Sequence, residues 1–262
     1  MPQTRQGVLF DARRRRAADV ATLSWDYAGG HSVPEHFHDA DQLVYAETGV
    51  MTVRTARGTW VVPTRRAVWV PASVPHAIDM LGDVTMKTLY LRPGLARRLP
   101  RRCCVLHVSP LLRALVLHAC ERGSLGRAAR DARVTGVLLD QLAEARSVPF
   151  QLPTPRDPRA RRVADRLALD PADGRALDGL AAEAGASKRT IERAFRLETG
   201  MTFGKWRQQL RLLHATRLLA AGAKVTTAAV EAGYDSTSAF IAMFRRSMGA
   251  TPSRYFEKDV TP

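Results

Sequence analysis

The hydrophobic pattern of the chain changes once, at about residue 93. Before that point, residues 51–55 alternate in side-chain character, Gly58 marks a turn, and residues 60–62 are apolar again, which is the pattern of a β-hairpin. Two more short apolar runs, 68–70 and 86–91, lie between glycines and prolines. Short strands at regular spacing, with no helical repeats between them, predict a sandwich or a barrel.

Apolar residues recur at helical spacing after residue 110, which predicts two helices, over residues 111–122 and 134–145. Four prolines then fall between residues 149 and 158, too many for a helix interior or a central strand, so we expect a semi-rigid linker there. From residue 159 to about 256 the pattern is helical. The sequence predicts a multidomain chain divided into residues 1–100, 101–148, 149–158 and 159–256.

The helical part contains one unit twice. Gly185 and Gly233 each follow the pair Glu-Ala and precede a serine, Ser187 and Ser236. A glycine that tolerates positive φ lets two helices meet in a tight turn, and a serine at the start of the next helix caps its free N–H groups. We therefore predict two helix-turn-helix modules, joined by a helix over residues 203–221.

The second helix of each module has one face left for a partner. In the first module the outward residues are polar and mostly basic: Lys188, Arg189, Glu192, Arg193 and Arg196. The offset of the repeat assigns a smaller, nearly uncharged set to the second module: Thr237, Ser238, Ile241, Ala242 and Arg245. Ser236, at the start of this helix, is a further candidate for contact with DNA. Arg and Lys bond guanine edges or neutralise phosphates, so the first set suits a DNA major groove and the second should discriminate bases less strongly. A solvated basic face is the simpler explanation for any single set.

The charge balance agrees with a polyanionic partner. The chain of 262 residues has 40 Lys+Arg and 25 Asp+Glu, hence a net charge of +15.

No apolar run approaches the ~20 residues that cross a bilayer, and the N-terminus lacks a signal-peptide core. Three cysteines, at spacings that match no zinc motif or disulfide framework, fit a reducing compartment. We expect a cytoplasmic protein with no membrane partner.

The second module and the segment after it resemble a known family. Residues 232–236 read Ala-Gly-Tyr-Asp-Ser, Phe240 follows, then Phe-Arg-Arg at 244–246 and Gly-Ala-Thr-Pro-Ser-Arg-Tyr-Phe at 249–256. Together with the repeat, residues 159–256 resemble the DNA-binding domain of the AraC/XylS family of bacterial transcription regulators. The resemblance implies double-stranded DNA as a partner, with both recognition helices on one face of the duplex, in successive major grooves about 34 Å apart.

The N-terminal half carries a second motif. His36, His38 and Gln42, followed later by His76, resemble the two cupin motifs, and these four positions bind metal in cupin enzymes. The resemblance implies a cupin-like β-barrel as the sensor domain. Three neutral imidazoles and an amide would bind a divalent ion, although Gln42 replaces the usual Glu and removes a charged ligand. The alternatives are an organic effector pocket or histidines that are only structural. Trp69 and Asp79 are expected to line the same cavity.

These expectations lead to an AraC-type, sequence-specific transcriptional regulator, an activator or a repressor, that responds to a small molecule or a metal. No cofactor is certain, and a divalent metal is the candidate. The two helices after the barrel are expected to join a homodimer, or else to pack their apolar faces only on their own barrel, and RNA polymerase is a further expected partner. The alternative is a metal-dependent cupin enzyme whose basic helical domain only localises it. No acid or base beside the histidines supports that alternative, so we expect no enzymatic activity.

Overall fold

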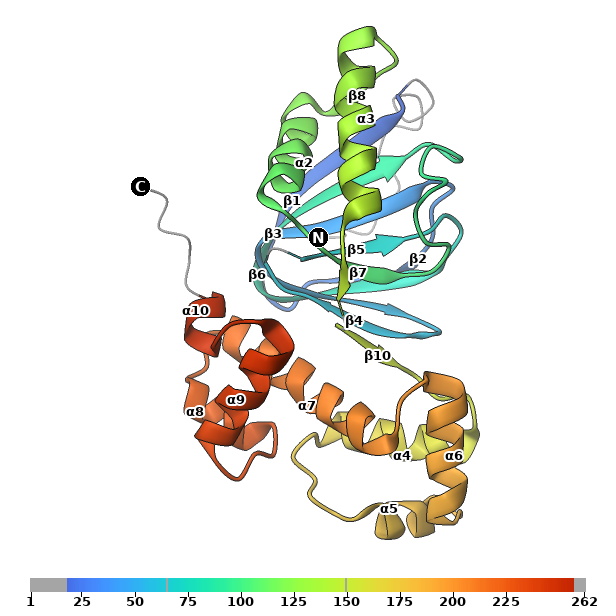
Figure 1. The fold of residues 1–262 in the computed structure, drawn as a ribbon, viewed down its shortest axis with the longest axis vertical. Coiled ribbons are helices and arrows are strands. Elements are labelled where there is room, and N and C mark those ends of the chain that lie inside the picture. Colours follow the sequence, from blue (N-terminus) through green and yellow to red (C-terminus); the bar gives the residue numbers. More distant parts are fainter. Residues whose placement is uncertain (1–17, 65, 149, 257–262) are drawn as a thin grey trace, which may run out of the picture. The chain divides into compact units, whose positions relative to one another are not determined.

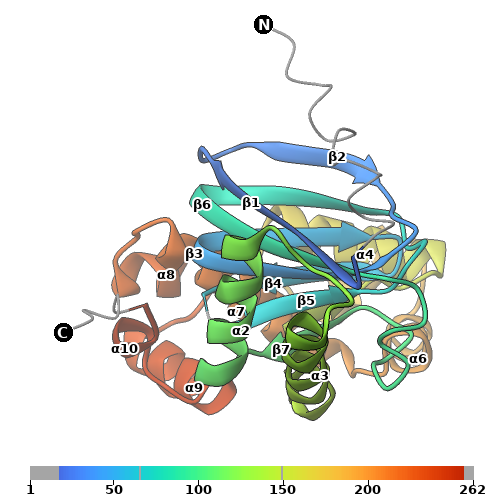
Figure 2. The same ribbon diagram turned by 90° about the horizontal axis from the view of Figure 1, so that it is seen from above.

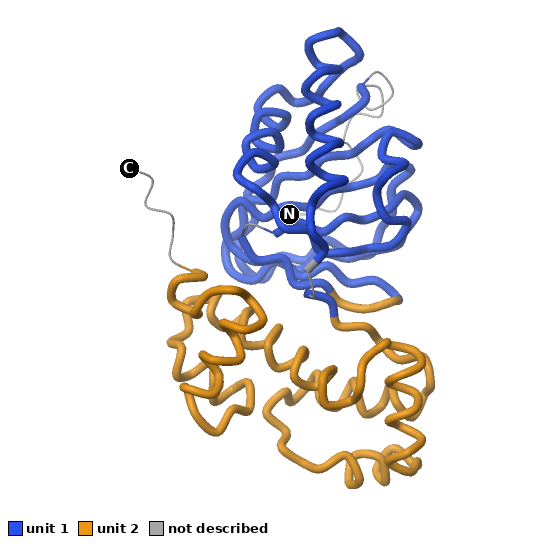
Figure 3. Tube along the Cα trace, in the orientation of Figure 1, with its two compact units in different colours: residues 1–56, 60–151 blue, residues 57–59, 152–262 orange. Residues whose placement is uncertain are grey.

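The computed structural model describes residues 18–64, 66–148 and 150–256. They belong to two compact units (Figure 3). The first unit consists of residues 1–56 and 60–151, and the second of residues 57–59 and 152–262. The first is rich in sheet and the second is helical, as expected for the two ends of the chain. No helix in the described ranges is both long enough and apolar enough to cross a membrane.

A sheet of ten strands forms the frame of the first unit (Figure 1). The strands are β1 (Val20–Tyr27), β2 (Ser32–His36), β3 (Asp41–Thr55), β4 (Gly58–Val62), β5 (Arg66–Val70), β6 (His76–Leu91), β7 (Cys104–His107), β8 (Ser124–Leu125), β9 (Ser147–Val148) and β10 (Gln151–Pro153). The hairpin expected around Gly58 is confirmed, since β3 pairs with β4.

The long strands β3 and β6 are the central pair of this sheet. They run antiparallel from the pair Asp41–Leu91 to the pair Arg54–Ala77. One edge of β6 is covered by β3 over this length, and β1 and β2 share the other edge. The main strand order, β8-β1-β6-β3-β5-β7-β9, ends in two different strands. The end strands β8 and β9 do not pair with each other over the described residues, so the expected barrel is not closed.

Two helices cover one face of the sheet, α2 (Pro110–Arg122) and α3 (Ala129–Glu144) (Figure 2). The Ser109 hydroxyl caps α2 by accepting a hydrogen bond from the Leu112 amide at 3.1 Å. Leu112 and Leu138 belong to the apolar core that these helices form with sheet residues such as Leu43 and Leu89. The first helix matches the prediction, whereas α3 begins at Ala129 and not at residue 134.

The second unit contains seven helices in its described part: α4 (Pro158–Leu169), α5 (Leu177–Glu183), α6 (Lys188–Thr199), α7 (Phe203–Ala220), α8 (Val225–Glu231), α9 (Thr237–Met248) and α10 (Pro252–Phe256). The repeat corresponds to the pairs α5–α6 and α8–α9, and α7 connects them. We call residues 170–176 the α4–α5 connection.

Part of the expected linker has regular structure. Residues 151–153 form β10, which pairs with β4. The Trp206 indole of α7 donates a hydrogen bond to the Pro153 carbonyl at 2.8 Å. The Asp157 carboxylate caps α4 by accepting from the Arg159 amide at 2.9 Å, and bonds from the Arg159 side chain hold the pKa of that carboxyl well below its usual range. Proline is tolerated in an edge strand and at a helix start, which explains how this segment is ordered.

Two buried tryptophans of the first unit provide a matched test of the core. Trp69 and Trp60 are each 1% exposed. The Trp69 indole donates to the Pro100 carbonyl at 2.9 Å, whereas the Trp60 indole nitrogen has no hydrogen-bond partner among the described residues. We expect Trp69→Phe to lower the free energy of unfolding by about 1 kcal/mol more than Trp60→Phe does, because only the first loses a hydrogen bond. Urea unfolding of both variants measures this, and equal losses would contradict it.

Candidate DNA interface and histidine site

The turn of the first module has the geometry that a helix-turn-helix requires. Gly185 follows α5 with φ of +67°, in the left-handed region that favours glycine. The Ser187 hydroxyl then accepts a hydrogen bond from the Thr190 amide at 3.2 Å, which caps α6. Glycine and serine therefore fulfil the two roles that the sequence predicted for them.

Helix α6 is buried on one face and exposed on the other. Ile191 and Phe195 are fully buried in the core of the unit. All five residues predicted for the outward face are exposed: Lys188, Arg189, Glu192, Arg193 and Arg196. Lys188 forms an ion pair with Asp178 of α5 at 3.3 Å, so this lysine is partly neutralised. The remaining set is basic and accessible, as contact with a nucleic acid requires.

Helix α9 repeats this arrangement with smaller side chains. The Ser236 hydroxyl caps it by accepting from the Ala239 amide at 3.1 Å, and Phe240 and Phe244 are fully buried. Among the residues predicted for its free face, Ser236, Ser238 and Arg245 are exposed, and Thr237 and Ile241 are half-buried. This face carries little charge, so its contacts with DNA would be mainly hydrogen bonds and van der Waals contacts.

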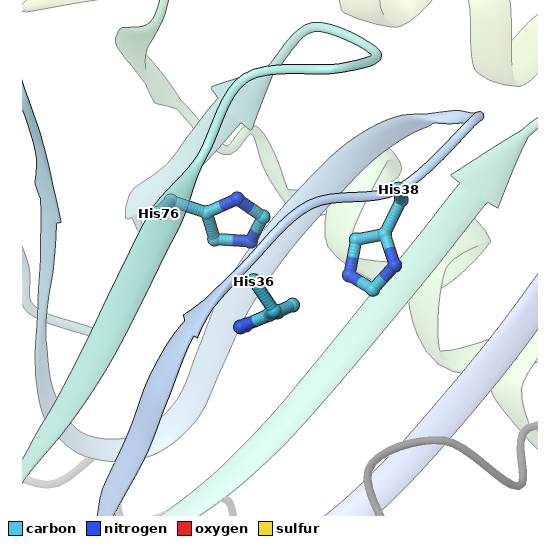
Figure 4. A group of neighbouring side chains, drawn as sticks. All are labelled: His36, His38 and His76. Atoms are coloured by element: carbon cyan, nitrogen blue, oxygen red, sulfur yellow. The ribbon is translucent and has the colours of Figure 1, made fainter.

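Three histidines meet in the first unit, beside the end of β2 and the start of β6 (Figure 4). The ring centroids of His36 and His76 lie 4.3 Å apart, and those of His36 and His38 lie 4.9 Å apart. One ligand nitrogen from each histidine lies within 4.8 Å of the other two. His36 and His76 are also cross-strand partners, which explains why residues 40 positions apart converge.

Hydrogen bonds orient two of these rings. His36 Nδ1 lies 2.7 Å from the Pro34 carbonyl oxygen, and His76 Nδ1 lies 2.9 Å from that of Val74. A carbonyl oxygen has no proton to give, so each Nδ1 donates, and in the neutral form of the ring the Nε2 atom then keeps a lone pair. Metal-binding histidines commonly hold their second nitrogen in this way.

Burial keeps His76 neutral. Its side chain is almost fully buried, and desolvation lowers its pKa to about 4, against the opposing effect of the Val74 hydrogen bond. Its Nε2 is buried without a hydrogen-bond partner among the described residues. A neutral imidazole with a buried lone pair is a suitable ligand for a divalent ion.

Gln42 lies on the same sheet and is also buried. Its amide nitrogen donates to the Thr88 hydroxyl at 3.0 Å, and Thr88 in turn donates to the Leu43 carbonyl at 3.0 Å. The Gln42 Oε1 atom is buried with no hydrogen-bond partner in the described part of the chain. The side-chain oxygen of Gln42, and not its nitrogen, is therefore the atom that remains available to bind a ligand.

Three details differ from the sequence interpretation. His38 follows the end of β2 instead of continuing it, and its ring packs at 4.8 Å against that of Tyr90, a neighbour that we did not predict. Trp69 belongs to the core beneath α2 and α3, on the opposite face from Gln42. Asp79 lies three residues after His76, on the other face of β6, where it pairs with Arg54 at 2.7 Å. Neither Trp69 nor Asp79 lines the histidine site.

The matches to known families agree with this architecture. Residues 18–145 match the AraC-like ligand binding domain, and residues 180–258 match a helix-turn-helix domain. A sheet-rich ligand-binding domain followed by two helix-turn-helix modules defines a DNA-binding transcriptional regulator. The chain belongs to the AraC family of such regulators.

Relatives of known name are regulators as well. NimR of Escherichia coli strain K12, an HTH-type transcriptional regulator, is 35% identical over 229 residues, which are 87% of this chain and 84% of NimR. RipA of Corynebacterium glutamicum is 29% identical over 81% of this chain and 61% of its own length. A crystal structure of ToxT from Vibrio cholerae, with an unsaturated fatty acid bound, gives a TM-score of 0.39 at 12% identity, covering 90% of this chain and 94% of that one. This last similarity is too low to carry an inference.

The cap of α9 can be tested with two serines of the same helix end. Ser236 accepts a backbone hydrogen bond, whereas Ser238 is an exposed position within the first turn. We expect Ser236→Ala to lower the free energy of unfolding of the helical unit by about 1 kcal/mol, since a cap is lost. Ser238→Ala should change it by less than about 0.5 kcal/mol. Denaturant unfolding followed by circular dichroism measures both, and a larger loss from Ser238→Ala would contradict the assignment.

Proposed function

We propose that α6 and α9 enter successive major grooves on one face of DNA, and that the histidine site of the first unit receives the regulatory signal. The observation that supports the first part is the repeated helix, capped by serine, anchored on one face and bare on the other. Double-stranded DNA is the macromolecular partner, and the protein acts in the cytoplasm, where that DNA is accessible.

The two helices divide the work of recognition. Arg189 and Arg193 on α6 can reach base edges. Lys188, Arg196 and Glu192 would determine the electrostatic potential that α6 presents to the DNA. On α9, Ser236, Thr237 and Ser238 suit phosphates, Ile241 suits a thymine methyl, and Arg245 suits a phosphate. Sequence reading therefore falls mainly on α6, and α9 adds affinity.

The histidine site suits a divalent metal. His36 and His76 offer Nε2 lone pairs, His38 is the third ligand, and Gln42 offers an oxygen. Nitrogens that share one zinc ion at about 2.0 to 2.1 Å lie closer together than 4.8 Å, so small side-chain rotations would be needed on binding. A bound ion would supply a positive charge and open positions for an effector. The domain organisation, with a cupin-like sensor over residues 1–100, helices over 101–148, the linker 149–158 and the DNA-binding domain 159–256, is part of the proposal.

The regulator acts as a homodimer in this proposal. Helices α2 and α3 carry the exposed apolar residues Leu111 and Val137, which are 51% and 46% exposed. A second copy would cover them, and RNA polymerase is the partner at the promoter. Metal or effector binding would shift the population of dimer arrangements that fit DNA.

A metal-dependent enzyme is the second candidate, and the three histidines favour it, since such a site with open positions can activate a substrate. The names of the relatives support the regulator instead. An enzyme would turn over a substrate at the loaded site, whereas a regulator changes its DNA affinity when the site is loaded.

Base reading by α6 can be tested by removing one side chain at a time. We expect Arg189→Ala or Arg193→Ala to cost about 1 to 3 kcal/mol of binding free energy and to relax specificity at one base position. Arg245→Ala should weaken all sequences about equally. Arg101→Ala, an exposed arginine of the first unit outside α2 and α3, is the control for the lost charge. Titration of selected duplexes with single base-pair changes measures these effects, and a stronger penalty for changes beneath α9 than beneath α6 would contradict the division of work.

The histidine site is tested with the double variant His38→Ala/His76→Ala. If the site binds metal, the wild type should retain about one Zn²⁺ or Co²⁺ per chain after dialysis and the variant should retain none. DNA affinity without metal should stay nearly intact, and only the metal-dependent change, typically about 1 to 3 kcal/mol, should disappear.

The control for this experiment is His31→Ala, an exposed histidine of the same unit. If the histidines are only structural, the double variant should lose thermal stability, because buried partners would remain unpaired at about 1 to 3 kcal/mol each. A lower melting temperature, with no metal bound by either protein, would reject the metal site.

A further inference from the structure

The α4–α5 connection is held by two arginines of helix α7. Arg207 donates through Nη1 to the Arg175 carbonyl at 2.8 Å and through Nη2 to the Asp173 carbonyl. One helical turn later, Arg211 donates through Nε to the Pro171 carbonyl at 3.0 Å and through Nη2 to the Asp173 carbonyl at 3.3 Å. Four hydrogen bonds from two rigid guanidinium groups thus fix the path of a connection that has no helix or strand of its own.

The same connection is tied to the first module. The Asp173 carboxylate, 5% exposed, accepts from the Arg175 amide at 2.9 Å and from its Nη2 at 2.8 Å. These bonds lower the pKa of Asp173 to about 2, so it is charged at neutral pH. Arg175 Nη1 also pairs with Glu183, at the end of α5, at 2.9 Å. The connection is therefore fastened to the helix that precedes the turn of the first module.

The second module rests on this connection through its own turn. Gly233 has φ of +75°, and a Cβ atom there would lie 2.8 Å from Arg211 Nη2 and 2.9 Å from the Ala172 Cα. Gly185, at the equivalent turn of the first module, also has positive φ, but a Cβ there would meet no described atom within 4 Å. The two glycines satisfy the same turn geometry, and only Gly233 is packed against a distant part of the chain.

We propose that Arg207, Arg211 and Gly233 are positioning residues that fix the orientation of α9 relative to α6, and so the number of base pairs between the two DNA sub-sites. The inference rests on the proposed function, in which both helices enter major grooves. Helix α7 connects the modules and packs against α8 and α10 of the second one, so this packing is one attachment of the second module to the rest of the unit. The contact of its turn with the α4–α5 connection is a second point of attachment, and two separate points define an orientation.

The number of base pairs between the two DNA sub-sites distinguishes a residue that positions the modules from a residue that only stabilises the fold. One inserted base pair moves a sub-site by about 3.4 Å along the duplex and rotates it by roughly 34°. A rigid pair of modules cannot follow this change, whereas a loosely attached second module can. A residue that only stabilised the fold would change the affinity for every spacing by the same factor.

The test uses the full chain and DNA duplexes. Selection from a random duplex library first defines the site preferred by the wild type. Binding is then measured by fluorescence anisotropy for that site and for versions with one base pair added or removed between the two sub-sites. The wild type should lose affinity by about tenfold or more when the spacing changes, comparable with a mismatched base pair.

The variants are Gly233→Ala, which forces the turn away from Arg211, and Arg211→Ala, which removes two hydrogen bonds without adding an atom. Gly185→Ala is the matched control for a glycine of positive φ. We expect the spacing penalty to fall to less than about threefold in both test variants, or the preferred spacing to shift, and to stay at the wild-type value in the control. Since the penalty is a ratio for one protein, a general loss of affinity does not affect it.

An unchanged spacing penalty in Arg211→Ala, with the helical content of the wild type, would overturn the positioning role, even if Gly233→Ala failed to fold. If the wild type itself selected a site with a single sub-site, two-groove binding would be wrong, which is a failure of the proposed function and visible before any variant is made.

Discussion

A recognition helix has to be held firmly along one face while the other face stays bare, and a few buried aromatic rings meet this requirement in both modules. Phe195 of α6 packs against Phe203 at 5.4 Å and Trp206 at 5.1 Å between ring centroids, with interplanar angles of 82° and 69°. In α9, Phe240 and Phe244 lie 5.7 Å apart. Large rings bury much area per residue, and edge-to-face pairs add directional preference. Few positions are needed for this packing, so the polar side chains on the opposite face of each helix stay exposed.

The features that the sequence could predict are those encoded over short distances. The repeated Glu-Ala-Gly and its serine predict a turn and a cap, because both depend on a few neighbouring residues, and the helices around them follow from one apolar face. The start of α3 was predicted too late, because residues 129–133 are mostly polar and show no apolar face. Strand β10 was predicted as a linker, because its partner β4 lies about 90 residues away and its composition favours an extended, unpaired chain.

The histidine site shows the same limit. The spacing of His36 and His38 predicted that they would meet on one face of a strand. Their rings do lie together, although β2 ends at His36 and the His38 ring packs on Tyr90. Cross-strand pairing brings His76 to His36, which no local pattern shows. The orientation of Gln42 depends on Thr88, 46 residues away. Arg207 and Arg211 look like ordinary exposed charges of an amphipathic helix until their carbonyl partners are known.

In the proposed mode of DNA binding, the unequal charge of the two recognition faces explains why their relative orientation should be fixed. The predicted free face of α9 exposes two serines, Ser236 and Ser238, and one arginine, Arg245, so few charged groups are available there to hold the second module on DNA. Its contacts add to those of α6 only if it reaches the adjacent groove without further ordering, since each degree of freedom lost on binding reduces affinity. A second module that is already oriented by folding meets its groove at a high effective concentration once α6 is bound. The weaker face therefore gains most from a rigid attachment, and the contacts of Arg207, Arg211 and Gly233 lie where that rigidity is needed.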